Sequence, residues 1–482
     1  MRTSLTELLA RIAVRFGSGP VRAYLVGGMV RDILLGRPPR DLDLLLEAAE
    51  DDKEESLRTL ARLAGMDPVP FDRRAPVTYR LIAGGIILDV SFCPPGGIGE
   101  ALERRDFTIN AMAVPLPWGG SSGNGGGEIL LDARTVRARL VDPLGGLADL
   151  DLKRVSSASP TALEEDPLRM LRAVRLAFTL EGFELARHLV PQIQLHAPAI
   201  SGAAAERVSL ELEMILASNR AGRALRQMDE MDLLSPVLPE LDPLRGLAQP
   251  SSYHDHDAYE HTLRAVEQAD ILVEGCPEAG LPGLGEEEKV VLKWAALLHD
   301  TGKPAACTVD AVGVPHFHGH ESISAEIAES TLRRLRVPSR FGEAAARLVS
   351  MHLRLGALAA ARAGDRPIRR LLRAAGDRFT LLALLSLADR RAAGGTRAPQ
   401  LEAALLETIR RAGLLRSEVA ALAAEEPLLR GQDVMRILDI EPGPRVGSVL
   451  GWLDRLRIDG RISTREEAEA VLRSLPPPRI EG

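Results

Sequence analysis

The sequence has few cysteines and few aromatic residues, and it has no long apolar run. Cys93, Cys276 and Cys307 are scattered, which argues against a disulfide framework and against a zinc site built on paired thiolates. No segment approaches the ~18 consecutive apolar residues of a membrane span, so no membrane partner is expected. Aromatic residues make up 3% of the chain, which argues against an all-β fold. These absences predict a protein of the reducing cytoplasm.

The chain also has fewer basic than acidic residues. The chain has 60 Lys and Arg against 67 Asp and Glu, and its net charge of −7 excludes a uniformly basic nucleic-acid-binding surface. With 45% hydrophobic and 26% charged residues, the 482-residue chain can bury several cores. Its Ala, Leu, Arg and Glu content favours helices. We therefore expect an α+β protein in which a small mixed α/β head precedes a mostly helical remainder.

Hydrophobic periodicity and turn residues predict how the chain is organised. In the head they predict helix 5–16, strand 22–28, helix 29–36, strand 41–46, helix 47–64 and a hairpin over 76–92 that turns at Gly84 and Gly85. A flexible loop is expected at 119–127. The predicted domains are a head at 1–140, a helical neck at 141–240, a histidine-bearing domain at 241–400 and a helical tail at 401–482.

Two carboxylates in the head form the first candidate site. Asp41 and Asp43 are two residues apart in a predicted strand, so their side chains share a face and could hold one hard cation. Asp89, on another predicted strand, is the best-placed third carboxylate. Such a group suits nucleotidyl transfer assisted by two Mg²⁺ ions. An isolated pair of this kind is also typical of an exposed turn or strand edge.

A glycine turn precedes these carboxylates. Gly27 and Gly28 follow a predicted strand and precede a helix, which lets backbone N–H groups approach a triphosphate. Arg31 lies one turn further along and adds a positive charge. A Gly-Gly pair alone is usually only a tight turn.

A second candidate site lies in the segment EEDPLRMLRAVR. Pro167 begins a predicted helix, and Asp166 and Arg169 are spaced i, i+3 at its start. Arg172 and Arg175 continue along the same slowly drifting face. From charge spacing alone, a solvated helix with surface ion pairs explains this pattern better than a binding site does.

A histidine cluster forms the third candidate site. Eight of the ten histidines fall between residues 254 and 352. His261, His299, Asp300 and Asp389 lie on separate predicted helices and offer nitrogen and oxygen ligands suited to a divalent metal that activates water. We expect the remaining histidines at 254, 256, 316 and 318 to be ordinary core or surface residues.

Five blocks in the first 178 residues carry a resemblance. LVGGMVRD, DLDLLL, RRDFTINAMA, LVDPLGGLADL and EEDPLRMLRAVRLAF occur in this order. The sequence thereby resembles the class II family of tRNA nucleotidyltransferases (CCA-adding enzymes) and bacterial poly(A) polymerases. The resemblance implies a polymerase-β-like head that acts on the 3′ end of tRNA or another RNA. Asp41 and Asp43 would bind Mg²⁺, and Gly28 and Arg31 would lie near the nucleotide.

The resemblance also implies roles for later blocks. Arg105 would contact the triphosphate or sugar, and Asp106 and Asn110 would organise the joint between head and neck. In the E-D-x-x-R element, Asp166 and Arg169 would read the Watson–Crick edge of the incoming base. Cytosine and adenine both present an exocyclic amine beside a ring-nitrogen acceptor, so an Asp that accepts and an Arg that donates pair with CTP and ATP. Guanine and uracil present the reverse pattern.

The pattern H…HD…D resembles the HD phosphohydrolases, which implies a divalent transition metal in the third site. His320 and His352 occupy places where some HD proteins carry further ligands or phosphate contacts. The identity of that metal, and whether the domain hydrolyses a phosphoester, stay open.

Several functional alternatives stay open. Within the family, full CCA addition, CC-only addition, A-only addition and poly(A) synthesis are not separated by the sequence. A protein uridylyltransferase also joins such a head to an HD domain, but it lacks the E-D-x-x-R element and is much longer. An RNA-binding module with an inactive head is disfavoured because Asp41 and Asp43 are both present.

Overall fold

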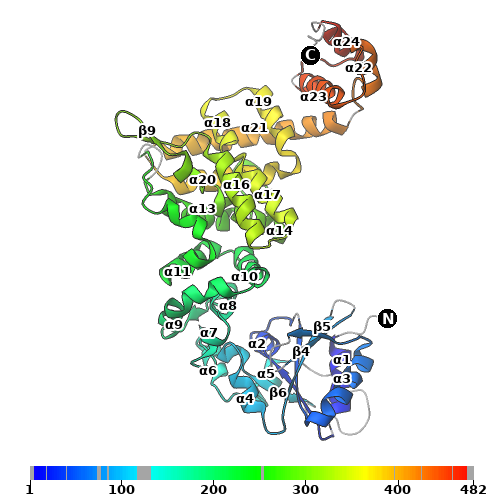
Figure 1. The fold of residues 1–482 in the computed structure, drawn as a ribbon, viewed down its shortest axis with the longest axis vertical. Coiled ribbons are helices and arrows are strands. Elements are labelled where there is room, and N and C mark those ends of the chain that lie inside the picture. The colour runs from blue at the N-terminus through cyan, green and yellow to red at the C-terminus, as the bar shows by residue number, and fades with distance from the viewer. Residues whose placement is uncertain are drawn as a thin grey trace. The chain divides into compact units, whose positions relative to one another are not determined.

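A computed structural model describes residues 5–17, 19–39, 41–72, 77–83, 86–116, 132–250, 255–395, 397–424, 426–458 and 460–474. The chain forms two compact units, shown with their elements in Figure 1. The first unit contains residues 1–211 and 227–237, and the second contains residues 212–226 and 238–482. The predicted turn at Gly84 and Gly85 and the predicted loop at 119–127 lie outside the described residues.

The first unit is built on a six-stranded sheet. Its strands are β1 (Arg22–Val26), β2 (Leu42–Glu47), β3 (Val69–Asp72), β4 (Thr78–Ala83), β5 (Ile86–Cys93) and β6 (Ala113–Leu116). They are ordered β3-β4-β5-β2-β1-β6, and β2 runs parallel to β5 while the other described pairs are antiparallel. The helices α1 (Leu5–Phe16) and α3 (Glu50–Ala64) pack against each other beside the sheet (Figure 1). The short helix α2 (Gly28–Leu34) follows β1 directly.

The strand register places polar side chains in one row. Asp43 on β2 is the register partner of Asp89 on β5, and Asp89 is the register partner of Arg80 on β4. Side chains directly opposite each other on neighbouring strands project from the same face of a sheet. The row therefore lies on one face, while residues that alternate with it, such as Leu44 and Leu88, are buried.

The remainder of the first unit consists mostly of short helices. Its elements are α4 (Ile98–Glu103), η1 (Thr108–Asn110), α5 (Ala133–Ala138), α6 (Gly146–Asp151), β7 (Arg154–Val155), α7 (Ala162–Glu165), α8 (Leu168–Thr179), β8 (Glu184–Leu185), α9 (Leu189–His196), η2 (Ala197–Gly202) and α12 (Leu234–Val237). The helices α10 (Ala205–Ala217) and α11 (Ala221–Glu230) are divided between the two units, because residues 212–226 belong to the second. Helix α8 buries one apolar face, which includes Met170, Leu171 and Val174. Its opposite face carries Arg169, Arg172 and Arg175.

The second unit is a helical assembly around a buried central helix. It contains η3 (Pro239–Leu244), α13 (Ala258–Leu272), η4 (Pro277–Ala279), α14 (Glu286–Leu298), α15 (Lys303–Ala306), β9 (Thr308–Val309), β10 (Pro315–His316), α16 (His320–Arg334), α17 (Ser339–Val349), α18 (His352–Ala360), α19 (Asp365–Ala375), η5 (Gly376–Arg378), α20 (Phe379–Ala393) and α21 (Ala398–Ala424). Helix α20 is buried on all sides from Phe379 to Ala388 and packs against α13, α14 and α18. Its all-round apolar sequence is what a central helix requires.

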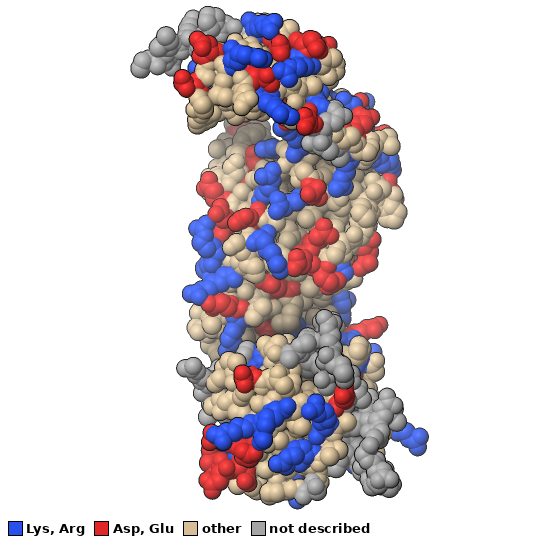
Figure 2. All heavy atoms as spheres, turned by 90° about the vertical axis from the view of Figure 1, so that its right-hand side faces the viewer, with Lys and Arg blue, Asp and Glu red and all other residues tan. Residues whose placement is uncertain are grey.

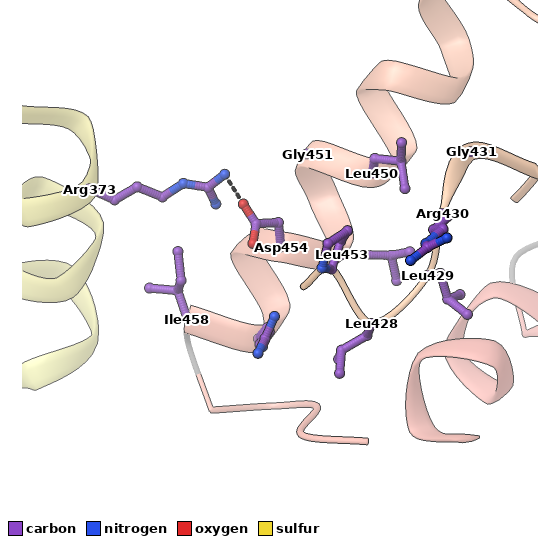
Figure 3. A pocket seen from close by; sticks show the side chains of 12 residues that line it. Arg373, Leu428, Leu429, Arg430, Gly431, Leu450, Gly451, Leu453, Asp454 and Ile458 are labelled. Atoms are coloured by element: carbon purple, nitrogen blue, oxygen red, sulfur yellow. Dashed lines mark ion pairs between the residues drawn. The ribbon is translucent and has the colours of Figure 1, made fainter. Parts of the chain in front are cut away.

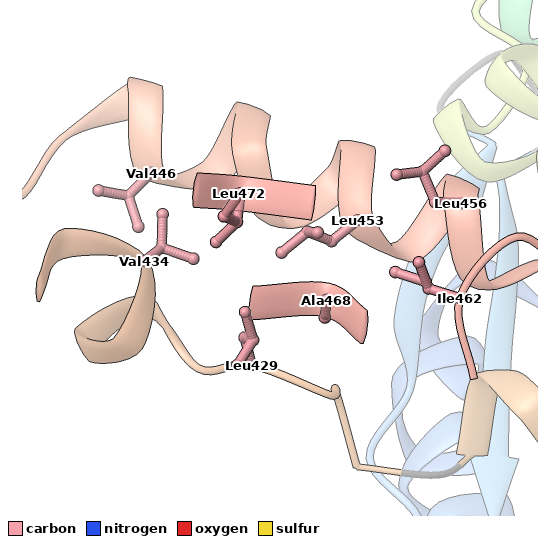
Figure 4. Close-up of a cluster of buried hydrophobic side chains, with 8 residues drawn as sticks. All are labelled: Leu429, Val434, Val446, Leu453, Leu456, Ile462, Ala468 and Leu472. Carbon is pink, nitrogen blue, oxygen red and sulfur yellow. The ribbon is translucent and has the colours of Figure 1, made fainter. Parts of the chain in front are cut away.

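The chain ends in a three-helix segment with its own small core. Its helices are α22 (Gly431–Leu438), α23 (Pro444–Ile458) and α24 (Arg465–Arg473). Figure 4 shows the buried side chains that these helices and their connections share, namely Leu429, Val434, Val446, Leu453, Leu456, Ile462, Ala468 and Leu472. Among the described helices, none is long and apolar enough to cross a bilayer. The expected α+β class, with a small mixed head and a helical remainder, is confirmed, whereas the division into four domains stays a prediction.

Candidate active sites

The first site lies where β1 and β2 meet helix α2. Asp41 is exposed immediately before β2, and Asp43 is partly buried within the strand. Gly27 adopts a φ of 73°, and a Cβ at this residue would lie 2.4 Å from Oδ2 of Asp43. The close approach explains why the turn uses glycine. The turn therefore brings backbone directly beside the carboxylate.

The electrostatics of Asp43 suit a cation. Burial raises the pKa of Asp43, and the nearby charges of Asp89 and Asp41 raise it further, while Arg105 opposes this rise. A carboxylate destabilised by burial and by like charges gains most from a bound positive ion. Asp43 and Asp89 are register partners on the sheet, Asp41 precedes β2 by one residue, and carboxylate oxygens are the ligands that Mg²⁺ prefers. The residues present thus fit the divalent cation that the resemblance implies.

Asp89 has a partner that the sequence reasoning missed. Nε and Nη2 of Arg80 donate to Oδ1 and Oδ2 of Asp89, each at 2.7 Å. Arg80 and Asp89 are equally far from the predicted turn at Gly84 and Gly85, so hairpin symmetry could have paired them from the sequence. In this structure Asp89 is therefore an ion-pair partner as well as a neighbour of Asp43.

A polar network joins the glycine turn to helix α8. Nη1 of Arg31 donates to Oδ1 of Asn110 at 2.8 Å, and Nδ2 of Asn110 donates to Oδ1 of Asp106 at 3.0 Å. Nη1 of Arg172 donates to Oδ2 of Asp106 at 3.0 Å. Burial alone would raise the pKa of Asp106, but Arg172 and Asn110 outweigh it and lower this pKa to about 2. Asp106 and Asn110 thus link Arg31 on α2 to Arg172 on α8, and their role at a joint between head and neck stays a prediction.

The base-reading candidates lie together at the start of α8, with different partners. Nη2 of Arg207 on α10 donates to Oδ2 of Asp166 at 2.7 Å. The guanidinium of Arg169 donates to the carbonyl of Ala162 at 3.0 Å and to the carbonyl of Arg104 at 2.9 Å. A base that pairs with Asp166 and Arg169 must therefore replace the hydrogen bonds that these residues make with Arg207 and with the two carbonyls.

Arg172 and Arg175, which continue the predicted row of nucleotide-site residues from Arg169, pair with a buried carboxylate. Nε of Arg172 and Nε of Arg175 lie 3.3 Å and 3.2 Å from the carboxylate oxygens of Glu211, which is 5% exposed. Their guanidinium groups are thus engaged inside the protein and do not form a solvated row. Arg207 and Glu211 were missed, although their i, i+4 spacing in RVSLE marks a shared helix face.

The third site brings together six side chains of the second unit. His261, His299 and Asp389 form one group whose ligand atoms lie within 4.8 Å of one another, and Asp300, His320 and His352 form a second such group. They come from five helices or helix ends, on α13, α14, α16, α18 and α20. His320 and His352, which the resemblance gave as possible further ligands or phosphate contacts, thus lie beside the four predicted ligands.

Asp300 connects the two groups. Its Oδ2 lies 3.1 Å from Nε2 of His299, and its Oδ1 lies 3.2 Å from Nε2 of His320. Lys303, one turn further along, donates to the same Oδ2 at 2.6 Å. His316 and His318 do not belong to either group, and His254 lies outside the described residues.

The hydrogen bonds of the histidine rings test whether a metal fits here. Nδ1 of His299, His320 and His352 lies 2.7 to 2.8 Å from a backbone carbonyl, and only an N–H can donate to a carbonyl. Each Nε2 of these rings therefore presents a lone pair in the neutral tautomer. Nε2 of His320 and Nε2 of His352 nevertheless face each other at 3.3 Å. A divalent cation between such atoms relieves this repulsion, so the donor set fits a metal.

The arginine-rich stretch at 353–400 forms ion pairs within the second unit. Arg369 pairs with Glu418, Arg373 with Asp454 and Arg391 with Glu402. Arg373 and Asp454 border a cavity of about 660 Å³ next to α23, which is lined by both leucine and arginine side chains and contains no predicted site residue (Figure 3). On the face drawn in Figure 2, basic and acidic side chains are interspersed.

A mixed sheet that carries Asp-x-Asp behind a glycine turn, joined to a helical domain with a His/Asp metal centre, defines a nucleotidyltransferase head with an HD domain. Profile matches agree: "Poly A polymerase head domain" at residues 23–66, "Probable RNA and SrmB- binding site of polymerase A" at 182–245 and "HD domain" at 258–394. The A-adding tRNA nucleotidyltransferase of Deinococcus radiodurans is 36% identical over 466 residues, which cover 94% of this chain and 95% of that protein. The CC-adding tRNA nucleotidyltransferase of Thermus thermophilus is 36% identical over 460 residues, with 94% and 93% covered.

Solved structures agree on the fold. The Thermotoga maritima CCA-adding enzyme complexed with tRNA superposes with a TM-score of 0.60 at 19% identity, covering 98% of this chain and 96% of that one. A CCA-adding enzyme in complex with ATP gives a TM-score of 0.62 at 20% identity, with 98% and 95% covered. The chain belongs to the tRNA nucleotidyltransferase family, and it is an enzyme of the nucleotidyltransferase class.

Proposed function

We propose that this protein adds C, A or both to the 3′ end of tRNA in the cytoplasm, without a nucleic-acid template, from CTP and ATP. The observation that carries the proposal is the group of three carboxylates on adjacent elements beside the glycine turn at Gly27. Its two full-length relatives named above add A or CC to tRNA, which supports the same substrate class.

The head residues divide the chemistry between them. Asp41 and Asp43 would hold Mg²⁺, which when bound lowers the barrier by activating the 3′-hydroxyl and neutralising the departing pyrophosphate. Gly27 and Gly28 bring backbone beside Asp43, where the triphosphate would lie. Arg105 is close enough to Asp43 to lower the pKa of that carboxyl, and it would bind phosphate or sugar from the same position.

Base selection follows from the hydrogen-bonding capacity of Asp166 and Arg169. A carboxylate only accepts and a guanidinium only donates, so the pair matches the amine and ring nitrogen of cytosine or adenine. Guanine or uracil would leave both groups unpaired, at a cost of about 1 to 3 kcal/mol each. In the structure Arg207 and two backbone carbonyls satisfy these groups, so both are paired before a base binds.

The decisive experiment offers tRNAs that end without CCA, in C, or in CC, together with each single nucleotide, and reads product lengths. Extension by at most three nucleotides with C and A alone is expected, and its stepwise pattern distinguishes CCA, CC-only and A-only addition. Long A tracts would instead establish the poly(A) polymerase reading. Asp41→Asn and Asp43→Asn should each abolish incorporation with the fold intact, whereas Asp51→Asn on α3 serves as the exposed control. Near-normal turnover of either site variant would contradict the metal assignment.

Selection is tested separately from RNA binding. Asp166→Ala and Arg169→Ala should lower the preference for CTP and ATP over UTP and GTP by more than they lower tRNA affinity. If incorporation of all four nucleotides and tRNA affinity fall together, the start of α8 is a structural element instead.

We further propose that the HD domain binds divalent transition metal and hydrolyses phosphoesters, such as 2′,3′-cyclic phosphates at damaged RNA ends. The two groups joined by Asp300 support it, because a shell without thiolates leaves positions for water and a phosphoryl oxygen. His299→Ala should remove bound metal and hydrolysis while sparing nucleotide addition, with the exposed His188→Ala as control. Absence of both metal and hydrolysis across Ni²⁺, Mn²⁺, Co²⁺ and Mg²⁺ would make the domain a scaffold.

A further inference from the structure

Arg80 is a positively charged residue among the acidic side chains of the head. Its guanidinium binds both oxygens of Asp89 at 2.7 Å, and the two side chains are 27% and 18% exposed. The hydrogen bond with Asp89 raises the pKa of Arg80, and the charges of Asp89, Asp41 and Asp43 add to it. A bidentate, partly shielded pair of this kind is among the stronger ion pairs in proteins.

The ion pair between Arg80 and Asp89 limits the number of carboxylates with free lone pairs for a cation. When a carboxylate accepts two hydrogen bonds from one guanidinium, the lone pairs that face the guanidinium are occupied. Asp43 is the register neighbour of Asp89 and lies beside the turn at Gly27. The row therefore contains one carboxylate held by an arginine and, next to it, another that faces the glycine turn.

We propose that Arg80 is a positioning residue that holds Asp89 in reserve, so that Asp89 joins the metal site only when a divalent cation displaces Arg80. The inference rests on the proposed function of the head as a Mg²⁺-dependent transferase. A guanidinium and a divalent cation compete for the same two oxygens, and the positive charge of Arg80 also opposes a second cation beside Asp43. In the resting head, Asp41 and Asp43 bind one cation. Asp89 can bind a cation only after its ion pair with Arg80 breaks.

The test measures metal occupancy at the head in the full-length protein. Fe²⁺ with ascorbate and peroxide generates hydroxyl radicals that cut the backbone next to bound iron. Fragment masses then separate cleavage near Asp43 and Asp89 from cleavage near His299 in the second unit. With Fe²⁺ kept well below its own dissociation constant, the readout is the Mg²⁺ concentration that halves head cleavage.

Arg80→Gln should lower this Mg²⁺ concentration about tenfold, because one competing positive charge is removed beside the site. Arg80→Lys keeps the charge but loses the two-point geometry, and it should give an intermediate value. In an Asp89→Asn background, the same Arg80→Gln change should lower this Mg²⁺ concentration by about threefold or less. Only the repulsion between the charge of Arg80 and the cation then remains to be removed. Arg62→Gln, which breaks an exposed pair with Glu55 on α3, should change nothing.

Each outcome decides the inference. An unchanged or raised Mg²⁺ requirement in Arg80→Gln overturns it. An equal gain from Arg80→Gln with and without the Asp89→Asn change overturns it too, because Asp89 would then not be the group that Arg80 restrains. Hydrogen exchange across β4 and β5 shows whether the variants keep the sheet. If the unaltered protein shows no head cleavage, or if Asp43→Asn leaves it unchanged, the head metal site itself fails.

Discussion

The buried contact between Asp106 and Arg172 makes a sharp prediction about stability. Asp106 is 11% exposed, its Oδ1 accepts from the backbone N–H of Phe107 and from Nδ2 of Asn110, and its Oδ2 accepts from Arg172. In Asp106→Asn, one oxygen becomes an NH₂ group. In either orientation of the amide, its NH₂ group faces a group that itself donates, either Arg172 or the N–H groups of Phe107 and Asn110. The variant therefore loses both charge and hydrogen-bond matching.

The size of the effect follows from the pKa of Asp106. This pKa falls from 3.8 to about 2 on folding. At ~1.4 kcal/mol for each pH unit, the charged form stabilises the fold by about 2 to 3 kcal/mol. Because the folded-state value lies below the unfolded one, this stabilisation is complete above about pH 4 and is lost as the pH falls toward about 2. Asp106→Asn should lack the benefit at neutral pH and should not lose it on acidification.

The measurement must report on the first unit alone, since a chain with two units need not unfold in one step. The protein is equilibrated in urea, given a short hydrogen-exchange pulse, and read on peptides that cover residues 106–116. Asp151→Asn is the matched control, because its ion pair with Arg137 is 52% and 44% exposed and should contribute about 1 kcal/mol or less.

Two results would refute this reasoning. One is an Asp106→Asn variant whose first unit unfolds within about 0.5 kcal/mol of the unaltered protein at pH 7. The other is an equal loss for Asp106→Asn and Asp151→Asn, which would mean that burial adds nothing to the pair. A double variant with Arg172→Gln should lose less than the sum of the two single losses, because the groups share one interaction.

Two further predictions concern the glycine turn and the second unit. Gly27→Ala should reduce nucleotide incorporation at least about tenfold, because its Cβ would meet Asp43 and Arg105 at a φ of 73°. Gly36→Ala has a similar φ of 69° with no atom within 4 Å of its Cβ, so single-turnover assays that find equal losses would remove the steric explanation. Lys293→Met should destabilise the second unit by about 3 to 5 kcal/mol, because it leaves Asp270 buried without the ammonium now 2.7 Å away. Exchange pulses on α13 and α14 measure this loss. Lys289→Met breaks a pair with the 76% exposed Glu286 and should cost about 1 kcal/mol or less, so equal losses would contradict the buried-charge argument.

The sequence by itself determined the features that depend on neighbours a few residues away. The short apolar runs in RAYLV and LDLLLE predicted β1 and β2, and the spacing of Asp41 and Asp43 placed them close together at the start of one strand. The pattern H…HD…D predicted His261, His299, Asp300 and Asp389 as one cluster, which the structure brings together. These features follow from local periodicity, which every short segment carries within itself.

Only the tertiary structure decided which charged groups meet. Asp166 pairs with Arg207, 41 residues away, and Asp106 with Arg172, 66 residues away. A guanidinium pairs equally well with any carboxylate, and this chain has 60 basic and 67 acidic residues, so composition and spacing cannot choose among them. The tertiary structure makes the choice, and it places Arg172 and Arg175 of α8 beside the buried Glu211 of α10, which excludes the alternative of a solvated row. The resemblance pointed to His320 and His352, but only the tertiary structure shows that both rings reach Oδ1 of Asp300, at 3.2 Å and 4.0 Å.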